Sequence, residues 1–120
     1  MFNSLDELQA DIVDTLTVEL GDEPTFNAAI LTVKVKLAIR ELIQRRNYAA
    51  VGYLDDNSLA REKLMADIDN YYQVITDLAR YEYNRIGAEG EESHAENGIT
   101  RKYVTKDSIL RGVHAFVGFV

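Results

Sequence analysis

The chain has 120 residues, of which 47% are hydrophobic, and it carries a formal net charge of −7 at pH 7. These values predict one globular domain with a modest core and argue against full disorder. The absence of cysteine excludes disulfides and thiolate metal sites, and the negative charge argues against affinity for a nucleic-acid backbone. The start, MFNSLDELQ, lacks the basic region of a secretory leader, and no apolar run approaches the roughly 18 to 20 residues of a membrane span.

Charge is distributed in alternating blocks along the chain. Residues 1–23 hold seven acidic side chains and no lysine or arginine, whereas residues 24–46 hold five basic side chains and one acidic one. Residues 47–100 are acidic overall, and residues 101–120 are basic overall. Such blocks suit a surface that recognises another copy of the chain, because complementary patches set register and orientation. A chance scatter of charge is the alternative.

A first helix is predicted over residues 4–20. Ser4 is a suitable N-cap, and Glu7 follows at the spacing of a capping box. Gly21 and Pro24 then give the usual stop pattern. The apolar residues recur at helical spacing: Leu5, Leu8, Ile12, Leu16 and Leu20.

A second helix is predicted over residues 25–47, and it carries two apolar stripes. One stripe contains Phe26, Ile30, Val33 and Leu37, and the other contains Leu31, Val35, Ala38 and Leu42. A surface helix normally has one stripe, so two indicate a helix central to the core or one that also faces a neighbouring subunit. The run TVKVK alternates like a strand, which is the local alternative. Helix is preferred because the segments on both sides have helical composition.

A third helix is predicted over residues 57–86, after a turn around Gly52. The segment contains no proline or glycine. One face repeats at helical spacing through Met65, Ile68, Tyr72, Ile75, Ala79, Tyr83 and Ile86. A helix of this length would extend about 45 Å and would project or pack against partners. Its tyrosines, Tyr71, Tyr72, Tyr81 and Tyr83, suit either an interface or the edge of the core.

The remaining chain is a polar loop over residues 87–101 and a C-terminal segment over residues 102–120. One helical turn is predicted near residues 106–111, capped by Thr105 or Asp107. The end, VHAFVGFV, is β-prone and apolar, so it must be buried, paired within the domain or paired with another subunit. The predicted fold class is therefore mainly α: a small bundle of three main helices, one of them long, with a long polar loop and a short β-prone C-terminal segment.

The loop contains the one cluster that suggests metal chemistry. His94 lies near Glu91, Glu92 and Glu96, but their spacing matches no known ligand pattern, and a solvated acidic loop is the preferred reading. The motifs of nucleotide-binding loops, zinc proteases and serine hydrolases are absent from the sequence. We therefore expect no enzyme activity, no catalytic residue, no cofactor and no bound metal.

The run YEYNRIGAEGEESHAENGITRKY, residues 81–103, resembles the head–tail connector (adaptor) proteins of tailed bacteriophages. In that family a long helix ends in IGAEGE and is followed by an SH-x-ENGI-x-R-x-Y segment and a short apolar piece. The match covers about a fifth of the chain, and the helices before it agree in style and order. The family often has a proline where this chain has His114 and Ala115.

The resemblance implies a virion subunit at the head–tail interface, made in the bacterial cytoplasm. It implies a homo-oligomeric ring, expected to have twelve subunits, that contacts the portal protein and the next connector or tail protein. DNA would pass through the ring without specific binding, and no membrane is involved. The residues expected to contact partners are Glu89, Glu91, Glu92, His94, Glu96, Asn97, Arg101, Tyr103, Phe116 and Phe119. The alternative is a small cytoplasmic helical module for protein interaction or regulation.

Overall fold

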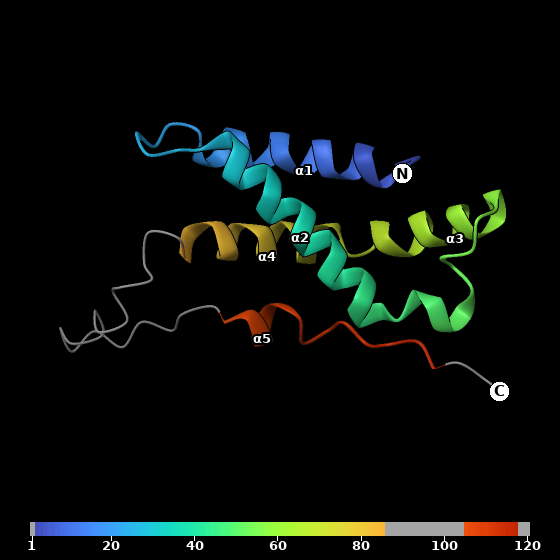
Figure 1. The fold of residues 1–120 in the computed structure, drawn as a ribbon. Coiled ribbons are helices and arrows are strands. Elements are labelled where there is room, and N and C mark those ends of the chain that lie inside the picture. The colour runs from blue at the N-terminus through green and yellow to red at the C-terminus, as the bar shows by residue number, and fades with distance from the viewer. Residues whose placement is uncertain (1, 86–104, 118–120) are drawn as a thin grey trace.

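The computed structural model describes residues 2–85 and 105–117, which form helices joined by turns (Figure 1). The elements are α1 (Leu5–Leu20), α2 (Ala28–Arg46), the 3-10 helix η1 (Tyr48–Val51), α3 (Ser58–Asp69), α4 (Tyr72–Arg85) and α5 (Lys106–Ile109). These described ranges contain no strand. The predicted mainly α bundle is confirmed.

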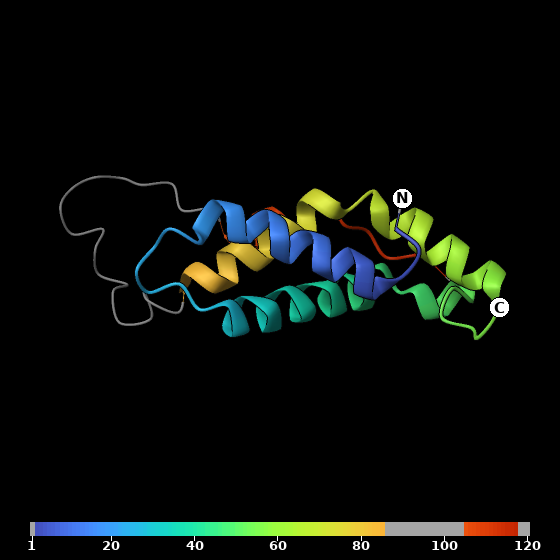
Figure 2. The same cartoon turned by 90° about the horizontal axis from the view of Figure 1, so that it is seen from above.

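The helices pack into an elongated bundle of 52 × 30 × 19 Å. Helix α2 packs most extensively against α4, and α1 contacts both of them (Figures 1 and 2). Helix α5 lies against α4, and the segment after it runs back along the C-terminal end of α2 (Figure 1). The core comprises Leu8, Ile12, Leu16, Leu31, Val35, Ala38, Ile39, Leu42, Met65, Ile68, Ile75, Leu78, Ala79 and Leu110. None of the helices in the described ranges is both long enough and apolar enough to cross a membrane.

Helix α1 begins and ends as predicted. The hydroxyl of Ser4 accepts the N–H of Glu7 at 3.2 Å, which satisfies one of the free amides of the first turn. The Glu7 carboxylate accepts the N–H of Asn3 at 2.7 Å, one residue before the position that a capping box uses. At the other end, the N–H of Gly21 donates to the carbonyl of Thr17 at 2.8 Å.

Helix α2 begins three residues later than predicted. The side chain of Asn27 accepts the N–H of Ile30 at 3.1 Å, so Asn27 is the N-cap and Pro24 belongs to the preceding turn. The N–H of Asn27 also donates to the hydroxyl of Tyr83 on α4 at 2.9 Å, which fixes the start of the helix. The helix ends where Asn47 adopts a left-handed conformation, with φ of 56°. The run TVKVK is helical, as preferred.

The prediction of one continuous helix over residues 57–86 is wrong. The chain instead forms α3 and α4, separated at Asn70 and Tyr71. Their amides donate to carbonyls three residues back, at 3.1 and 2.9 Å, instead of four residues back. Asp69 and Asn70 are residues whose side chains compete for backbone hydrogen bonds, so the helix is weakest there. The expected length of about 45 Å for this helix is therefore wrong as well.

The described C-terminal residues include the predicted helical turn. Thr105 caps α5, and its side chain and that of Ser108 each accept the other's backbone N–H, at 3.2 and 3.1 Å. Residues 113–117 have no regular secondary structure. The loop predicted over residues 87–101 lies outside the described residues.

Candidate assembly surface

Most of the predicted partner contacts fall outside the part of the chain that the structure describes. This is true of Glu89, Glu91, Glu92, His94, Glu96, Asn97, Arg101, Tyr103 and Phe119. Phe116 is described, and it is half-buried against its own chain. The possible metal cluster at His94 likewise has no described geometry. The contact surface that the structure does describe is therefore formed by the helices and by residues 105–117.

Phe116 is held by both its backbone and its ring. Its N–H donates to the carbonyl of Arg46 at 2.9 Å, and its carbonyl accepts from the side chain of Asn47 at 3.2 Å. The ring lies 3.9 Å from the guanidinium carbon of Arg46 and makes an edge contact with Tyr53, centroid to centroid 5.4 Å. Cation–π and aromatic contacts of this kind stabilise the packing beyond the area that they bury. Phe116 and Val113 thus pack against the same chain, whereas Val117 is 75% exposed.

Arg46 is the centre of a polar network between α2, α3 and the C-terminal segment. Its guanidinium donates twice to Asp67 and once, at 2.6 Å, to the carbonyl of His114. The hydrogen bond to Asp67 raises the pKa of Arg46, so this side chain stays charged. Tyr48 is fully buried and donates its hydroxyl to Asp67 at 2.7 Å. Burial raises the pKa of Tyr48 most, and that hydrogen bond raises it further.

The tyrosines of α4 and of the turn before it contact their own chain. The hydroxyl of Tyr72 donates to Asp11 at 2.6 Å, and burial together with that bond raises the pKa of Tyr72. Tyr83 holds the start of α2, and Tyr71 stacks under Arg46 with 5.1 Å from ring centroid to guanidinium carbon. Tyr71, Tyr72 and Tyr83 thus lie at the edge of the core, which is one of the two predicted roles.

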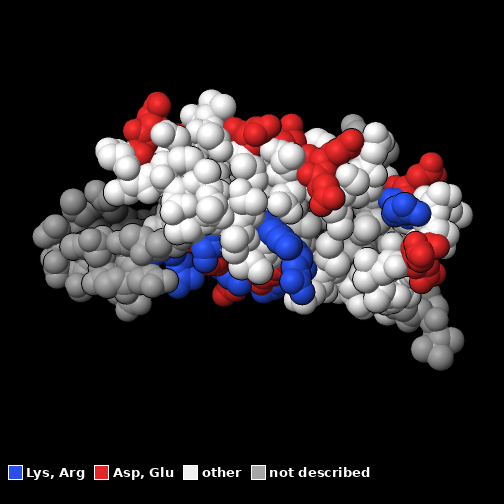
Figure 3. Space-filling model, turned by 45° about the horizontal axis from the view of Figure 1, so that its top comes forward, with Lys and Arg blue, Asp and Glu red and all other residues white. Residues whose placement is uncertain are grey.

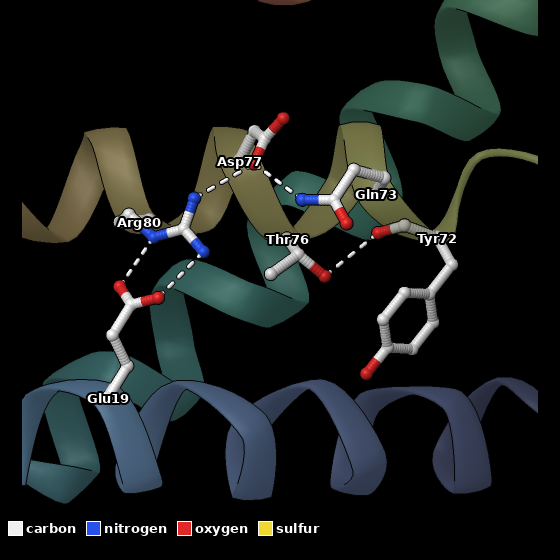
Figure 4. Close-up of polar contacts among 6 residues, drawn as sticks. All are labelled: Glu19, Tyr72, Gln73, Thr76, Asp77 and Arg80. Atoms are coloured by element: carbon white, nitrogen blue, oxygen red, sulfur yellow. Dashed lines mark hydrogen bonds and ion pairs between the residues drawn. The ribbon is translucent and has the colours of Figure 1, made fainter.

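A second polar network joins the end of α1 to α4 (Figure 4). Arg80 contacts the carboxylate of Glu19 through two nitrogens and donates to Asp77 at 2.8 Å. Gln73 donates to the same Asp77 oxygen at 2.8 Å. The hydrogen bond to Glu19, and to a smaller extent the one to Asp77, raises the pKa of Arg80. These contacts are all within the chain, so the network positions α4 against α1.

The outer face of α2, defined by Ile30, Val33 and Leu37, is the clearest candidate for a contact surface. These side chains are 36%, 52% and 50% exposed, whereas the opposite stripe of the same helix is buried. Large apolar side chains exposed one by one are normal, but three on successive turns form a patch typical of an interaction site. In the single chain α2 packs against α4 and α1 while this stripe stays exposed, so a neighbouring subunit at the stripe remains a prediction.

Charged groups border this apolar face. Lys36 and Arg40 are exposed on α2 beside Val33 and Leu37. Every acidic side chain of residues 1–23 is exposed. Asp11 and Glu19 contact α4, whereas no contact with another helix is found for Asp14 among the described residues. Figure 3 shows acidic side chains along the upper edge of that view and most basic ones toward its lower side, with a broad uncharged area between them. Acidic side chains also lie among the basic ones on the lower side and at the right end of the view. The surface therefore combines an apolar strip with both signs of charge.

The described residues can be compared with what a metal ion or a small molecule needs. Within residues 2–85 and 105–117, no three histidine, aspartate or glutamate side chains lie close enough to hold a metal ion. A depression of about 370 Å³ between the end of α1 and α4 is lined by Leu20, Glu23, Thr25, Asn27, Ile30, Tyr83 and Asn84. Its lining contains no pair of acid and base side chains in contact, and it borders the outer face of α2 at Ile30.

Sequence reasoning found the outer face of α2 but missed the Arg46 network. The two stripes of α2 are visible as helical spacing, so the apolar face needed no tertiary information. Arg46 and Asp67 are 21 positions apart, and nothing local in the sequence pairs them.

No protein-family model, curated protein or solved structure matches the chain.

Proposed function

We propose that this chain is a structural virion protein that forms a ring between the portal and the tail of a tailed phage. The ring extends the channel through which DNA leaves the capsid and presents a docking surface for completion of the tail. The resemblance of residues 81–103 to head–tail connectors supports the viral setting. The role is structural, so it needs no reacting group or cofactor.

The observation that carries the proposal is the outer face of α2. A lone subunit gains nothing from Ile30, Val33 and Leu37 in water, whereas a neighbouring subunit would remove their apolar area from solvent. Identical subunits that meet through two different faces form a ring when the rotation between them closes. Exposed charges of both signs beside the apolar strip give such a contact its register.

The charge of the subunit suits a channel for DNA. Each chain carries a net charge of −7, so a ring of many copies repels the phosphate backbone instead of binding it. A duplex can slide through such a ring without being held at particular bases. Specificity in this role lies in the protein contacts, with the portal on one side and the tail on the other.

Electron microscopy of the full chain tests the proposal. The parent chain at high concentration, alone or mixed with the portal protein, should give rings. Leu37→Asp on the outer face of α2 should prevent them, whereas Leu59→Asp on α3 should not, although Leu59 is 58% exposed and Leu37 is 50% exposed. A chain that remains monomeric at every concentration and binds no portal would contradict the proposal. Binding of one cytoplasmic protein by that monomer would favour the interaction module instead.

A further inference from the structure

The outward side of α1 complements the outer face of α2. Val18 is 85% exposed, and Asp14 lies one turn before it on the same side of α1. On α2 the order along the helix is apolar and then basic, with Val33 and Leu37 followed by Arg40. Helix α1 thus presents an apolar side chain next to an acidic one, and α2 presents apolar side chains next to a basic one.

The spacing of these groups matches when the two helices run antiparallel. Asp14 lies four residues from Val18, which is about 6 Å along the axis at 1.5 Å per residue. Arg40 lies about 7.5 Å from the midpoint between Val33 and Leu37 at the same rise. A valine seated between those two α2 side chains therefore brings the carboxylate within reach of the guanidinium. Run in parallel, the same helices would place the acid at the N-terminal end of α2, away from Arg40.

We propose that the outer face of α2 is occupied by the α1 helix of a second copy of this chain, antiparallel, with Val18 between Val33 and Leu37 and Asp14 beside Arg40. The inference rests on the proposed function and assigns the contact between neighbouring ring subunits. Because the contact joins two different surfaces, each copy can contact one neighbour through α1 and another neighbour through α2. Other apolar partners could cover the outer face of α2, but a second copy of this chain also supplies Asp14 as the acidic partner of Arg40.

Single-cysteine chains test the contact directly, because the native sequence has no cysteine. A Val18→Cys chain mixed with a Val33→Cys chain should form a disulfide-linked heterodimer under mild oxidation. Neither chain alone should give a cross-linked dimer, since the contact is between unlike positions. Leu59→Cys, exposed on α3, replaces Val33→Cys in the control mixture and should not cross-link. Equal yields in both mixtures, or dimers from either chain alone, would overturn the assignment.

Charge reversal gives an independent test with reciprocal rescue. Asp14→Lys sets lysine against Arg40, and Arg40→Glu sets glutamate against Asp14, so each variant alone should associate more than about tenfold more weakly than the parent. An equimolar mixture should recover association, because each reversed face then finds its opposite. Glu62→Lys and Arg61→Glu, exposed on α3, make the same charge changes and should associate like the parent. Circular dichroism checks that each variant is folded.

The outcomes separate this inference from the proposed function. Rings that form in the parent, without the Val18–Val33 cross-link and without rescue in the mixture, would overturn the α1–α2 contact and leave the ring role standing. Cross-linked, rescuable pairs that never form rings, alone or with the portal protein, would support the contact and overturn the ring. If neither rings nor the Val18–Val33 cross-link formed, both the α1–α2 contact and the ring role would be overturned.

Discussion

The guanidinium of Arg46 meets the carboxylate of Asp67 at two points, with Nε 2.9 Å from Oδ2 and Nη2 2.8 Å from Oδ1. The two side chains are 11% and 18% exposed, so solvent screens the pair only weakly. Arg46 also lies over the ring of Phe116 and donates to the carbonyl of His114. One side chain therefore joins α2, α3 and the C-terminal segment.

Asp67→Asn should destabilise the chain by about 1.5–3 kcal/mol, because hydrogen bonds to a charged partner lose much of their strength when the charge is removed. Urea unfolding followed by circular dichroism measures the change. Asp69→Asn, two residues further along α3, is the matched control and should change stability by less than about 0.5 kcal/mol. Equal losses in the two variants would mean that the Arg46 pair contributes nothing particular.

Local signals in the sequence were sufficient for much of the fold. Ser4, Gly21 and Thr105 mark helix ends by their own chemistry, and the structure uses all three. Helical spacing also separated the buried from the exposed stripe of α2, which is the basis of the candidate surface. The strand-like run TVKVK is compatible with this helix, since Val33 and Val35 lie about 200° apart around its axis.

Other features were misread or could not be read from the sequence. The start of α2 at Ala28 has a local signal, the N-cap Asn27, which the stop pattern at Pro24 obscured, and a distant contact from Tyr83 that the sequence does not reveal. The break at Asn70 was missed because apolar spacing continues across it from Ile68 to Ile75. The tyrosines were ambiguous because an amphipathic ring suits an interface and a core edge equally well.

Phe116→Ala should loosen the C-terminal segment. It removes the ring from its contacts with Arg46 and Tyr53, which together are worth about 1–2 kcal/mol. Urea unfolding should report that loss, and trypsin should cleave after Arg111 faster than in the parent. Val117→Ala changes the next side chain, which is 75% exposed, and should have neither effect. Unchanged cleavage in Phe116→Ala would show that the aromatic contacts do not hold the segment.

Alkaline pH should destabilise the chain through Tyr48. Burial and the hydrogen bond to Asp67 raise its pKa in the folded state above the value of about 10 for an exposed tyrosine. The unfolded chain therefore releases this proton first, so the contribution is intact below about pH 10 and is lost as pH rises further. Stability measured from pH 8 to 11 should fall less steeply in Tyr48→Phe than in the parent. Identical slopes would exclude Tyr48 as the group responsible.

The ion pair between Glu19 and Arg80 should matter less than the one at Arg46. Its side chains are 44% and 30% exposed, so water and salt screen it, and Glu19→Gln should cost less than about 1 kcal/mol. That cost should shrink further in 1 M salt, where the screening length is about 3 Å. Unfolding in 0.1 and 1 M sodium chloride, with Asp67→Asn for comparison, tests this. A larger and salt-independent loss in Glu19→Gln would contradict the ranking.

Two valines on α2 allow the outer face to be tested against the core with the same substitution. Val35 is 0% exposed and Val33 is 52% exposed. Val35→Ser leaves a cavity and buries a hydroxyl, so it should cost about 2–3 kcal/mol, whereas Val33→Ser should change stability by less than about 0.5 kcal/mol. Self-association measured by sedimentation should show the reverse for Val33→Ser, which should associate more weakly than the parent while staying folded. If Val33→Ser lowered stability as much as Val35→Ser, the outer face would serve the fold of the single chain and not a neighbour.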